Sequence, residues 1–427
     1  MLSPEENDLL TRVDGDAPMA RLMRQHWVPV CLGEEVAEPD GRPLRVEAIG
    51  RSYVCFRDSE GRLGLLDELC PHRKASLVLG RNEEGGLRCL YHGWKFDVHG
   101  TCVAMSSEPE DSPLHGKVRH RAYPVQEWGG FVWAWLDSEN PPRAFEPPAF
   151  APAADTPVSI VKIRVPANWA QIMEGQIDSA HSSSLHSSDM KPAPVRTADA
   201  DDRAWYRPST DKSPRMQTQT TSYGFHYVAI RKPIRNAATH NYLRITEYIA
   251  PFTALIPPNA RYNVASVIVP ISDEETNFHF IAWGGKACPT TEEWRKFCRA
   301  QPGIDLDAKW RPVRTLDNDF LQNRDRMKLG SFTGIDGIPN QDIAMWVSMG
   351  ARVDRSTDLL GASDLAIVEF RRLMSDAARR VAEGGPAIGT EEPRVPHVSI
   401  SAKQGIFPKE VDWRTLDGQG EGVAAAE

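Results

Sequence analysis

The chain has 427 residues, of which 41% are hydrophobic and 25% are charged, and its formal net charge is −8. Its length allows more than one domain with a sizeable core. The negative charge argues against a nucleic-acid partner, and the longest apolar runs, such as residues 129–136, are too short to cross a bilayer. The acidic start lacks the pattern of a signal peptide. We therefore expect a cytoplasmic protein with no nucleic-acid or membrane partner.

The first third of the chain predicts a helix followed by short strands. Ser3, Pro4 and Glu6 form a capping-box pattern with proline in the first turn, so a helix should begin there. Strand-like apolar runs follow at residues 27–32, 51–58, 63–69 and 129–136. Such runs are typical of a small all-β domain. We expect a helical segment over residues 1–26 and a β domain over residues 27–140.

The rest of the chain begins with a proline-rich segment and then mixes both patterns. Residues 141–157 hold six prolines, so we interpret them as a linker, with a second domain over residues 158–427. A helix is predicted over residues 168–186, and strands over residues 242–256, 261–271 and 277–285. An amphipathic helix, capped by Ser363 and stopped at Gly384, is predicted over residues 363–385. Residues 418–427 should fray.

Two cysteines and two histidines lie in neighbouring loops, as Cys70-x-His72 and, after sixteen residues, Cys89-x-x-His92. Four such ligands around one ion usually bind zinc. A zinc finger, however, takes its cysteines from one loop and its histidines from a helix, whereas each loop here offers one of each. That arrangement favours a Rieske-type [2Fe-2S] cluster, with two cysteines on one iron and two histidines on the other.

A second candidate metal site is Asp178-x-x-His181-x4-His186 in the predicted helix over residues 168–186. On a helix the two histidines would lie about 140° apart with Asp178 between them, so a local bend would help both reach one ion. Two histidines and one carboxylate form the facial triad of non-haem iron oxygenases. Glu174 would share this face, where it would either support a metal-binding side chain or be exposed to solvent. Spacing alone leaves the third ligand open among Asp317, Asp319, Asp325, Asp336 and Asp342.

The two motifs in this order resemble those of the Rieske non-haem iron ring-hydroxylating oxygenases, in the alpha, or terminal oxygenase, subunit. The segments CPHR and CLYHGW are similar to the family's cluster loops, and EGQIDSAHSSSLH is similar to its mononuclear-iron motif. Weaker matches such as RNEEGGLRC and SFTGI resemble the phthalate and phenoxybenzoate dioxygenase group. The resemblance implies an α+β protein: an all-β Rieske domain, then a helix-grip-like catalytic domain with an antiparallel sheet.

The resemblance also assigns a role to each candidate residue. It implies that the cluster is held by Cys70, His72, Cys89 and His92. It implies that one Fe(II) is held by His181, His186 and Asp342, the aspartate of a Gln-Asp pair, with Asp317 and Asp319 as the fallback. Asp178 is implied to bridge His181 to His92 of a neighbouring subunit, in a homotrimer or in stacked trimers that form a homohexamer. Arg207 and Arg244 match carboxylate-binding arginines of phthalate dioxygenases, and Ser179 is a further substrate-binding candidate.

The implied reaction consumes O2 and electrons that a separate flavin and iron–sulfur reductase takes from NADH or NADPH. The substrate would be an aromatic carboxylate, such as a phthalate isomer or phenoxybenzoate, and the product a cis-dihydrodiol. One alternative is a Rieske monooxygenase or O-demethylase that acts on a methoxy- or otherwise substituted aromatic acid. An alternative of another class is an electron-transfer or zinc-binding protein without oxygenase activity.

Overall fold

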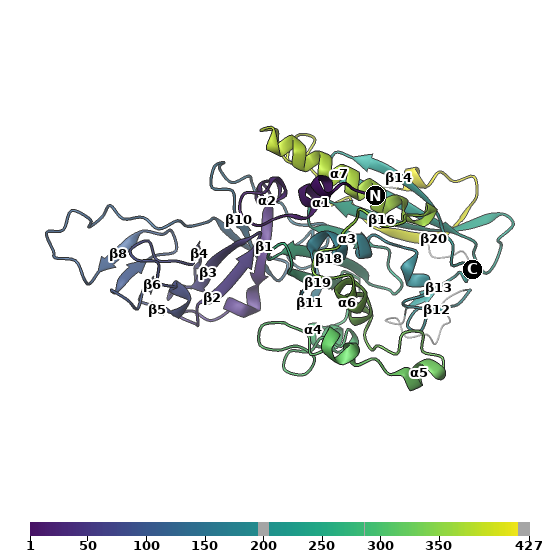
Figure 1. Ribbon diagram of the computed structural model, residues 1–427, viewed down its shortest axis with the longest axis horizontal. Helices are drawn as coiled ribbons and strands as arrows, with labels where there is room; N and C mark the ends of the chain where they lie inside the picture. Colours follow the sequence, from purple (N-terminus) through teal and green to yellow (C-terminus); the bar gives the residue numbers. More distant parts are fainter. Residues whose placement is uncertain (195–204, 286, 417–427) are drawn as a thin grey trace.

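The computed structural model describes residues 1–194, 205–285 and 287–416, and it has an elongated shape (Figure 1). A narrow β-rich region, formed mainly by residues 27–135, projects from a broader body that holds a large sheet and most helices. The predicted α+β fold class is therefore confirmed. Within the described ranges, no helix is long and apolar enough to cross a membrane. The predicted frayed tail at residues 418–427 lies outside the described residues.

The projecting region consists of three small antiparallel sheets. The first holds β1 (Trp27–Leu32), β10 (Phe131–Trp135) and β9 (Val125–Trp128). The second holds β2 (Leu44–Ala48), β3 (Arg51–Arg57) and β4 (Leu63–Asp67). The third, at the outer end, holds β5 (Arg81–Glu83), β6 (Gly86–Arg88), β7 (Trp94–Phe96) and β8 (Cys102–Met105). All four strands predicted in this region are present.

The body is built on one antiparallel sheet in the order β11-β19-β18-β17-β16-β15-β14, with β20 also paired to β16. Its strands are β11 (Val158–Val165), β14 (Arg215–Thr221), β15 (Gly224–Arg231), β16 (His240–Ile249), β17 (Thr253–Ile256), β18 (Asn263–Pro270), β19 (Thr276–Trp283) and β20 (Lys403–Pro408). A short parallel pair joins β12 (Lys191–Pro192) to β13 (Tyr206–Arg207). One edge of β16 is shared between β17 and β20, which places Gln404 opposite Arg244.

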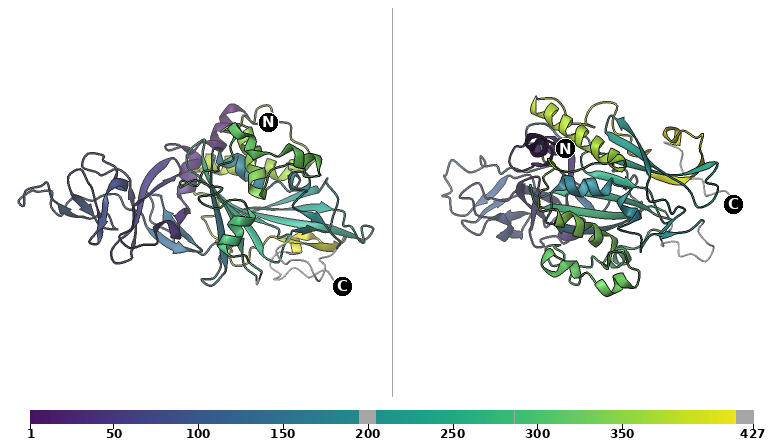
Figure 2. Two further views of the ribbon diagram at one scale, coloured as in Figure 1. Left: turned by 90° about the horizontal axis from the view of Figure 1, so that it is seen from below. Right: turned by 45° about the vertical axis from the view of Figure 1, so that its right-hand side comes forward.

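Helices cover the sheet (Figure 2), and its inner strands are buried along almost their whole length. All eight residues of β15 are buried, whereas burial alternates along the outer strand β14. α3 packs on β17 and β18, α7 packs on β14 and β15, and α6 packs on α3. The helices are α1 (Pro4–Thr11), α2 (Pro18–Arg24), α3 (Trp169–Gln176), α4 (Thr291–Phe297), α5 (Arg324–Lys328), α6 (Ile338–Ser348) and α7 (Leu365–Ala382).

The capping box at the chain start is confirmed, because Ser3 and Glu6 exchange hydrogen bonds at the N-terminus of α1. The predicted helix over residues 168–186 is wrong in its second half, since α3 ends at Gln176. The Asp178 carboxylate accepts from the N–H groups of Ala180 (2.7 Å) and His181 (3.4 Å), and such local side-chain bonds compete with helix formation. The separation of 140° between the two histidines therefore does not apply.

The C-terminal helix is present but differs at its start. Ser363 lies in a short 3₁₀ turn, Ala362–Asp364, and α7 begins at Leu365 without a side-chain cap. The predicted stop is confirmed, because α7 ends at Ala382 and Gly384, with φ of +85°, follows the C-cap residue Glu383. Glycine suits that left-handed conformation.

A continuous hydrophobic core joins the base of the projecting region to the body. It includes Val28 and Phe131 from the small sheet together with Val161 and Ile281 from the large one. A separate small core lies at the outer end and includes Cys70, Cys89, Leu87, Trp94 and Phe96. No helix or strand lies between Trp135 and Val158, where the linker is predicted. The predicted domain limits themselves stay predictions.

Candidate metal centres and active site

The two Cys/His loops at the outer end share one backbone pattern. In each loop the cysteine N–H donates to the carbonyl five residues ahead (2.9 and 2.8 Å), and the cysteine carbonyl accepts from the N–H four residues ahead (2.9 and 3.0 Å). Those fourth residues, Lys74 and Gly93, both have positive φ, 61° and 73°. Two equivalent tight turns therefore present Cys70 and Cys89 toward one small core.

The four side chains of these loops lie close together but not around a single point. Cys70 and Cys89 are buried, and the imidazole centroids of His72 and His92 are 4.4 Å apart. Burial and the neighbouring Cys89 thiol raise the pKa of Cys70 to about 11, so its thiolate requires a metal partner. No three of these four side chains place their ligand atoms within 4.8 Å of one another, as a single ion would require. Their spread fits a cluster with two iron ions.

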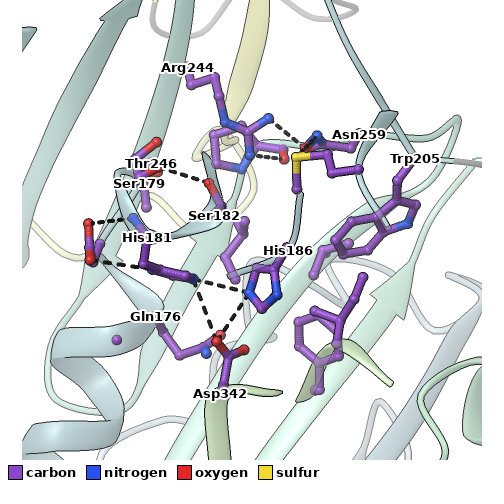
Figure 3. A pocket seen from close by; sticks show the side chains of 18 of the residues that line it. Gln176, Ser179, His181, Ser182, His186, Trp205, Arg244, Thr246, Asn259 and Asp342 are labelled. Atoms are coloured by element: carbon purple, nitrogen blue, oxygen red, sulfur yellow. Dashed lines mark hydrogen bonds and ion pairs between the residues drawn. The ribbon is translucent and has the colours of Figure 1, made fainter. Parts of the chain in front are cut away.

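The second centre forms where α3, the turn after it and α6 meet the large sheet (Figure 3). His181 begins a short 3₁₀ turn, His181–Ser183, and His186 follows on the next turn. Asp342 comes from the first half of α6, far away in the chain. Because the helix stops before Asp178, turns rather than a helical face bring both histidines toward this carboxylate.

Three ligand atoms converge at this centre. His181 Nε2 lies 3.1 Å from His186 Nε2 and 3.6 Å from Asp342 Oδ1, and His186 Nε2 lies 3.1 Å from the same oxygen. Two ligand atoms that each lie about 2.1 Å from an ion, with a right angle between their bonds to it, are about 3 Å apart. In the described part of the chain, no other three His, Cys, Asp or Glu side chains place ligand atoms within 4.8 Å of one another. The set fits one iron with positions left open.

The other aspartates considered as the third ligand lie away from this centre. All four are exposed: Asp317, Asp319, Asp325 and Asp336. Two of them form surface ion pairs, Asp325 with Lys328 and Asp336 with Arg326. The fold therefore brings Asp342, and not the fallback pair, to the two histidines.

Each histidine is oriented by a different partner. His181 Nδ1 lies 3.4 Å from Asp178 Oδ2, whereas His186 Nδ1 donates to Gln341 Oε1 at 2.8 Å. Gln341 in turn donates to Asp189 Oδ2 at 2.9 Å, which fixes the direction of its amide. Burial opposes a charge on His181, but its carboxylate neighbours outweigh burial and raise its pKa. With Nδ1 engaged in both rings, Nε2 is the atom left for a metal.

A cavity of about 60 Å³ adjoins these ligands. Its walls include Ser179, Ser182, Trp205, Arg244 and Asn259. A cavity that accepts benzene measures about 150 Å³, so an aromatic ligand enters this one only when side chains move. The candidate iron ligands His181, His186 and Asp342 also line this cavity.

Comparison with known proteins agrees with this geometry. The family model of the Rieske [2Fe-2S] domain matches residues 26–128, and that of the LigXa C-terminal domain matches residues 134–427. Over 97% of its length the chain is 58% identical to the phthalate 4,5-dioxygenase oxygenase subunit of Pseudomonas putida, covering 94% of that protein. It is 33% identical to the 3-chlorobenzoate-3,4-dioxygenase oxygenase subunit of Comamonas testosteroni, over 97% of this chain and 98% of that one. The chain belongs to the Rieske-type ring-hydroxylating oxygenases.

The fold agrees with this membership. The terminal oxygenase of carbazole 1,9a-dioxygenase from Nocardioides aromaticivorans IC177 matches with a TM-score of 0.57 and 19% identity, over 88% of this chain and 97% of that chain. The predicted cofactors of a Rieske oxygenase, a [2Fe-2S] cluster and a mononuclear iron with O2 as co-substrate, are confirmed at the level of the family. Oxygenase subunits of this family receive electrons from a ferredoxin or reductase and oligomerise.

Three arginines of this Rieske oxygenase are buried around the cavity: Arg207 (5% exposed), Arg231 (1%) and Arg244 (5%). Arg244 lines the cavity and donates to Asn259 Oδ1 (2.5 Å) and to the Pro257 carbonyl (3.0 Å). Arg207, also predicted to bind substrate, is not among the residues that line the cavity.

The side chain of Arg207 donates to Ser182 Oγ (2.7 Å) and Ser183 Oγ (3.0 Å). Burial and the charge of Arg244 lower the pKa of Arg207 to about 9. The third predicted substrate residue, Ser179, lines the cavity. Arg244 and Ser179 therefore face the cavity directly, and Arg207 acts on it through serine hydroxyls.

Glu174 serves neither of the roles considered for it. Its carboxylate is buried and accepts from Arg355 (2.9 and 3.1 Å) and from Arg371 Nε (2.8 Å). It therefore ties α3 to the C-terminal part of the chain and does not support an iron ligand.

Two residues of the site escaped sequence reasoning, Gln341 and Arg231. Gln341 stands directly before Asp342, but nothing in the sequence says which way its amide points. Arg231 carried a clearer signal, since it ends one largely apolar strand-like run, and Arg244 lies within another. A charged side chain in such a run is unusual unless it has a specific partner.

Proposed function

We propose that this chain is the terminal oxygenase that cis-dihydroxylates an aromatic dicarboxylate of the phthalate class. The observation that carries the substrate class is the cluster of three buried arginines with neutral partners beside the cavity. A buried cation without a counter-charge is destabilising, and carboxylates are the natural partners of guanidinium groups. The similarity to the phthalate 4,5-dioxygenase subunit supports the same substrate class.

In this proposal Cys70, His72, Cys89 and His92 hold the cluster, and His181, His186 and Asp342 hold one iron. When bound, that iron activates O2 beside the ring. The residues of the chain provide the rest: Asp178 and Gln341 orient the two imidazoles, and the buried walls of the cavity exclude bulk water.

The carboxylates of the substrate would be recognised on the arginine side of the cavity. Arg244 would exchange its contacts with Asn259 and Pro257 for one carboxylate, which also widens the cavity. Ser179 Oγ would donate to the second carboxylate, and Ser182 Oγ would do so by giving up its hydrogen bond to the Ser179 carbonyl, with Arg207 beside Ser182 adding positive charge. Fixing both carboxylates holds the far side of the ring toward the iron ligands, and that placement favours attack on the ring carbons.

Electrons would enter the iron site across a subunit boundary. Within one chain the Cys/His loops lie at the outer end of the projecting region, while α3 and α6 lie in the body (Figure 1). The side chain of Asp178 is 20% exposed and contacts His181, so a neighbouring subunit could reach it. We propose that His92 of a second subunit docks on Asp178 in a trimer or in stacked trimers.

The electron donor we propose is a single reductase with flavin and a plant-type iron–sulfur centre. It takes hydride from NADH or NADPH and passes single electrons to the cluster. The proposed location is the cytoplasm, and the seven free thiols of the chain suit that reducing compartment.

Oxygen uptake with a competent reductase tests this proposal. Phthalate, isophthalate, terephthalate, phenoxybenzoates and methoxybenzoates would be compared, with identification of each product. We expect the fastest coupled uptake with phthalate, and a cis-dihydrodiol as its product. Demethylation of a methoxybenzoate without turnover of any dicarboxylate would contradict the proposal.

A further inference from the structure

Arg231 is the last residue of β15 and is more deeply buried than either predicted substrate arginine. It donates through Nη1 to Ser179 Oγ (3.2 Å), and through Nη2 to the Ser179 carbonyl (2.7 Å) and Ser183 Oγ (3.4 Å). All these acceptors belong to the turn over residues 179–183, which also contains His181. Arg231 therefore connects the large sheet to the turn that forms one wall of the cavity.

Arg207 also holds this turn. Arg207 Nη1 donates to Ser183 Oγ (3.0 Å), so this one hydroxyl oxygen accepts from two guanidinium groups. Arg207 Nη2 donates to Ser182 Oγ, which lines the cavity. A displacement of Arg231 would therefore reach the cavity wall through the backbone at Ser179 and through Ser183.

The charges of these arginines are not neutralised nearby. Across residues 1–194, 205–285 and 287–416, no carboxylate forms an ion pair with Arg207, Arg231 or Arg244. The Nε–H groups of Arg207 and Arg231 are buried without an acceptor. Burial, followed by the charge of Arg244, lowers the pKa of Arg231 to about 10, and Asp211 partly offsets this. With pKa values of about 9 and about 10, Arg207 and Arg231 both remain protonated at neutral pH.

We propose that Arg231 is a positioning residue that makes the cavity selective for ligands with two negative charges. It holds the turn over residues 179–183 in place, and its charge adds to those of Arg207 and Arg244 without touching the ligand. A dianion relieves the repulsion among three buried cations more than a monoanion does. The inference rests on the proposed function, because it presupposes an anionic aromatic ligand beside the iron site.

Ligand pairs that differ in one charge can test this inference. Phthalate and its monomethyl ester share the ring and one carboxylate. Phthalate carries two negative charges, whereas the ester carries one. Calorimetry on the oxidised holoprotein gives both dissociation constants, and steady-state kinetics gives kcat and KM separately. The variants are Arg231→Gln, which removes the charge, and Arg231→Lys, which keeps it. Arg215→Gln, an exposed arginine on the adjacent strand, is the matched control.

We expect Arg231→Gln to weaken phthalate binding by about thirtyfold but monoester binding only by about threefold. The variant loses the charged hydrogen bonds to the turn over residues 179–183 and one of the three clustered positive charges. Arg231→Lys should retain the preference for phthalate. Its kcat should fall by about tenfold, since one ammonium group cannot hold Ser179 and Ser183 together. Arg215→Gln should change neither ligand.

Equal weakening of both ligands by Arg231→Gln would reduce Arg231 to a structural role and overturn the inference. If that variant does not fold and therefore loses its Rieske absorption spectrum, Arg231→Lys becomes the test of the inference. An unchanged kcat together with lost selectivity for phthalate in Arg231→Lys would contradict the proposal. Unmodified protein that binds neither ligand would overturn the proposed function along with the inference. Unmodified protein that binds phthalate, with Arg231→Gln indistinguishable from it, overturns the inference alone.

Discussion

The two candidate metal centres are constructed in opposite ways. The Cys/His loops come from one short stretch of chain, repeat one backbone pattern and fold around a small core of their own. The His181, His186 and Asp342 centre needs two turns after α3 and a helix from much later in the chain, all packed against the large sheet. A site for electron transfer is thus local and lies at an outer end. A site for oxygen chemistry is buried and depends on the whole body.

The largest effect should come from breaking the buried centre alone. Replacing His186 with Ala should abolish turnover, by at least about a thousandfold, because two remaining ligands do not retain iron in an open triad. The Rieske absorption spectrum should be unchanged, since the loops have their own core. Oxygen uptake and visible spectroscopy on the same sample measure both. Turnover that survives would exclude His186 from the iron site.

The reciprocal change breaks the local centre. Cys89→Ala should remove the red-brown colour that dithionite bleaches, and with it the reductase-driven turnover. Iron binding at the buried centre should persist, because the Cys/His loops pack around a separate core at the outer end of the projecting region. Iron analysis after chelation and colorimetry give the two occupancies. A colourless, zinc-loaded unmodified protein would overturn the cluster assignment itself.

A smaller effect is expected at the proposed connection between the centres. Asp178→Asn keeps an oxygen acceptor for the N–H of Ala180 but removes the charge that His181 faces. Both metals should stay bound, while single-turnover electron transfer slows by about 10–100-fold. Rapid-mixing absorbance of the reduced cluster measures that rate. Asp189→Asn is a useful control, since the Asp189 carboxylate accepts from Gln341 Nε2 rather than facing His181. Normal transfer in Asp178→Asn would contradict the bridge.

The smallest effect should be at Gln341. Gln341→Leu removes the acceptor for His186 Nδ1, so iron affinity should fall by about tenfold while the cluster is unaffected. Titration of the metal-depleted buried site with Fe(II) measures the affinity, and Met345→Leu, an exposed position on the same helix, serves as the control. An affinity equal to that of the control would show that Asp342 and the turns suffice to orient His186.

The sequence predicted most where the structure is local. The capping box of α1, the strands β1, β3, β4 and β10 and the pair of Cys/His loops follow from patterns within a few residues. Sequence reasoning was weakest just after α3. There Asp178 forms bonds with the backbone that end the helical pattern, and helical periodicity cannot anticipate them.

By itself, the sequence determined the family, the fold class and those candidate metal ligands that lie close together in the chain. Tertiary structure decided what depends on distant segments. It brought Asp342 to the histidines and left four other aspartates exposed, and it paired Gln341 with His186. It also set both Arg207 and Arg231 against the serines of the turn over residues 179–183. The physical reason is that direction and burial of a side chain are set by packing between elements, which no local spacing encodes.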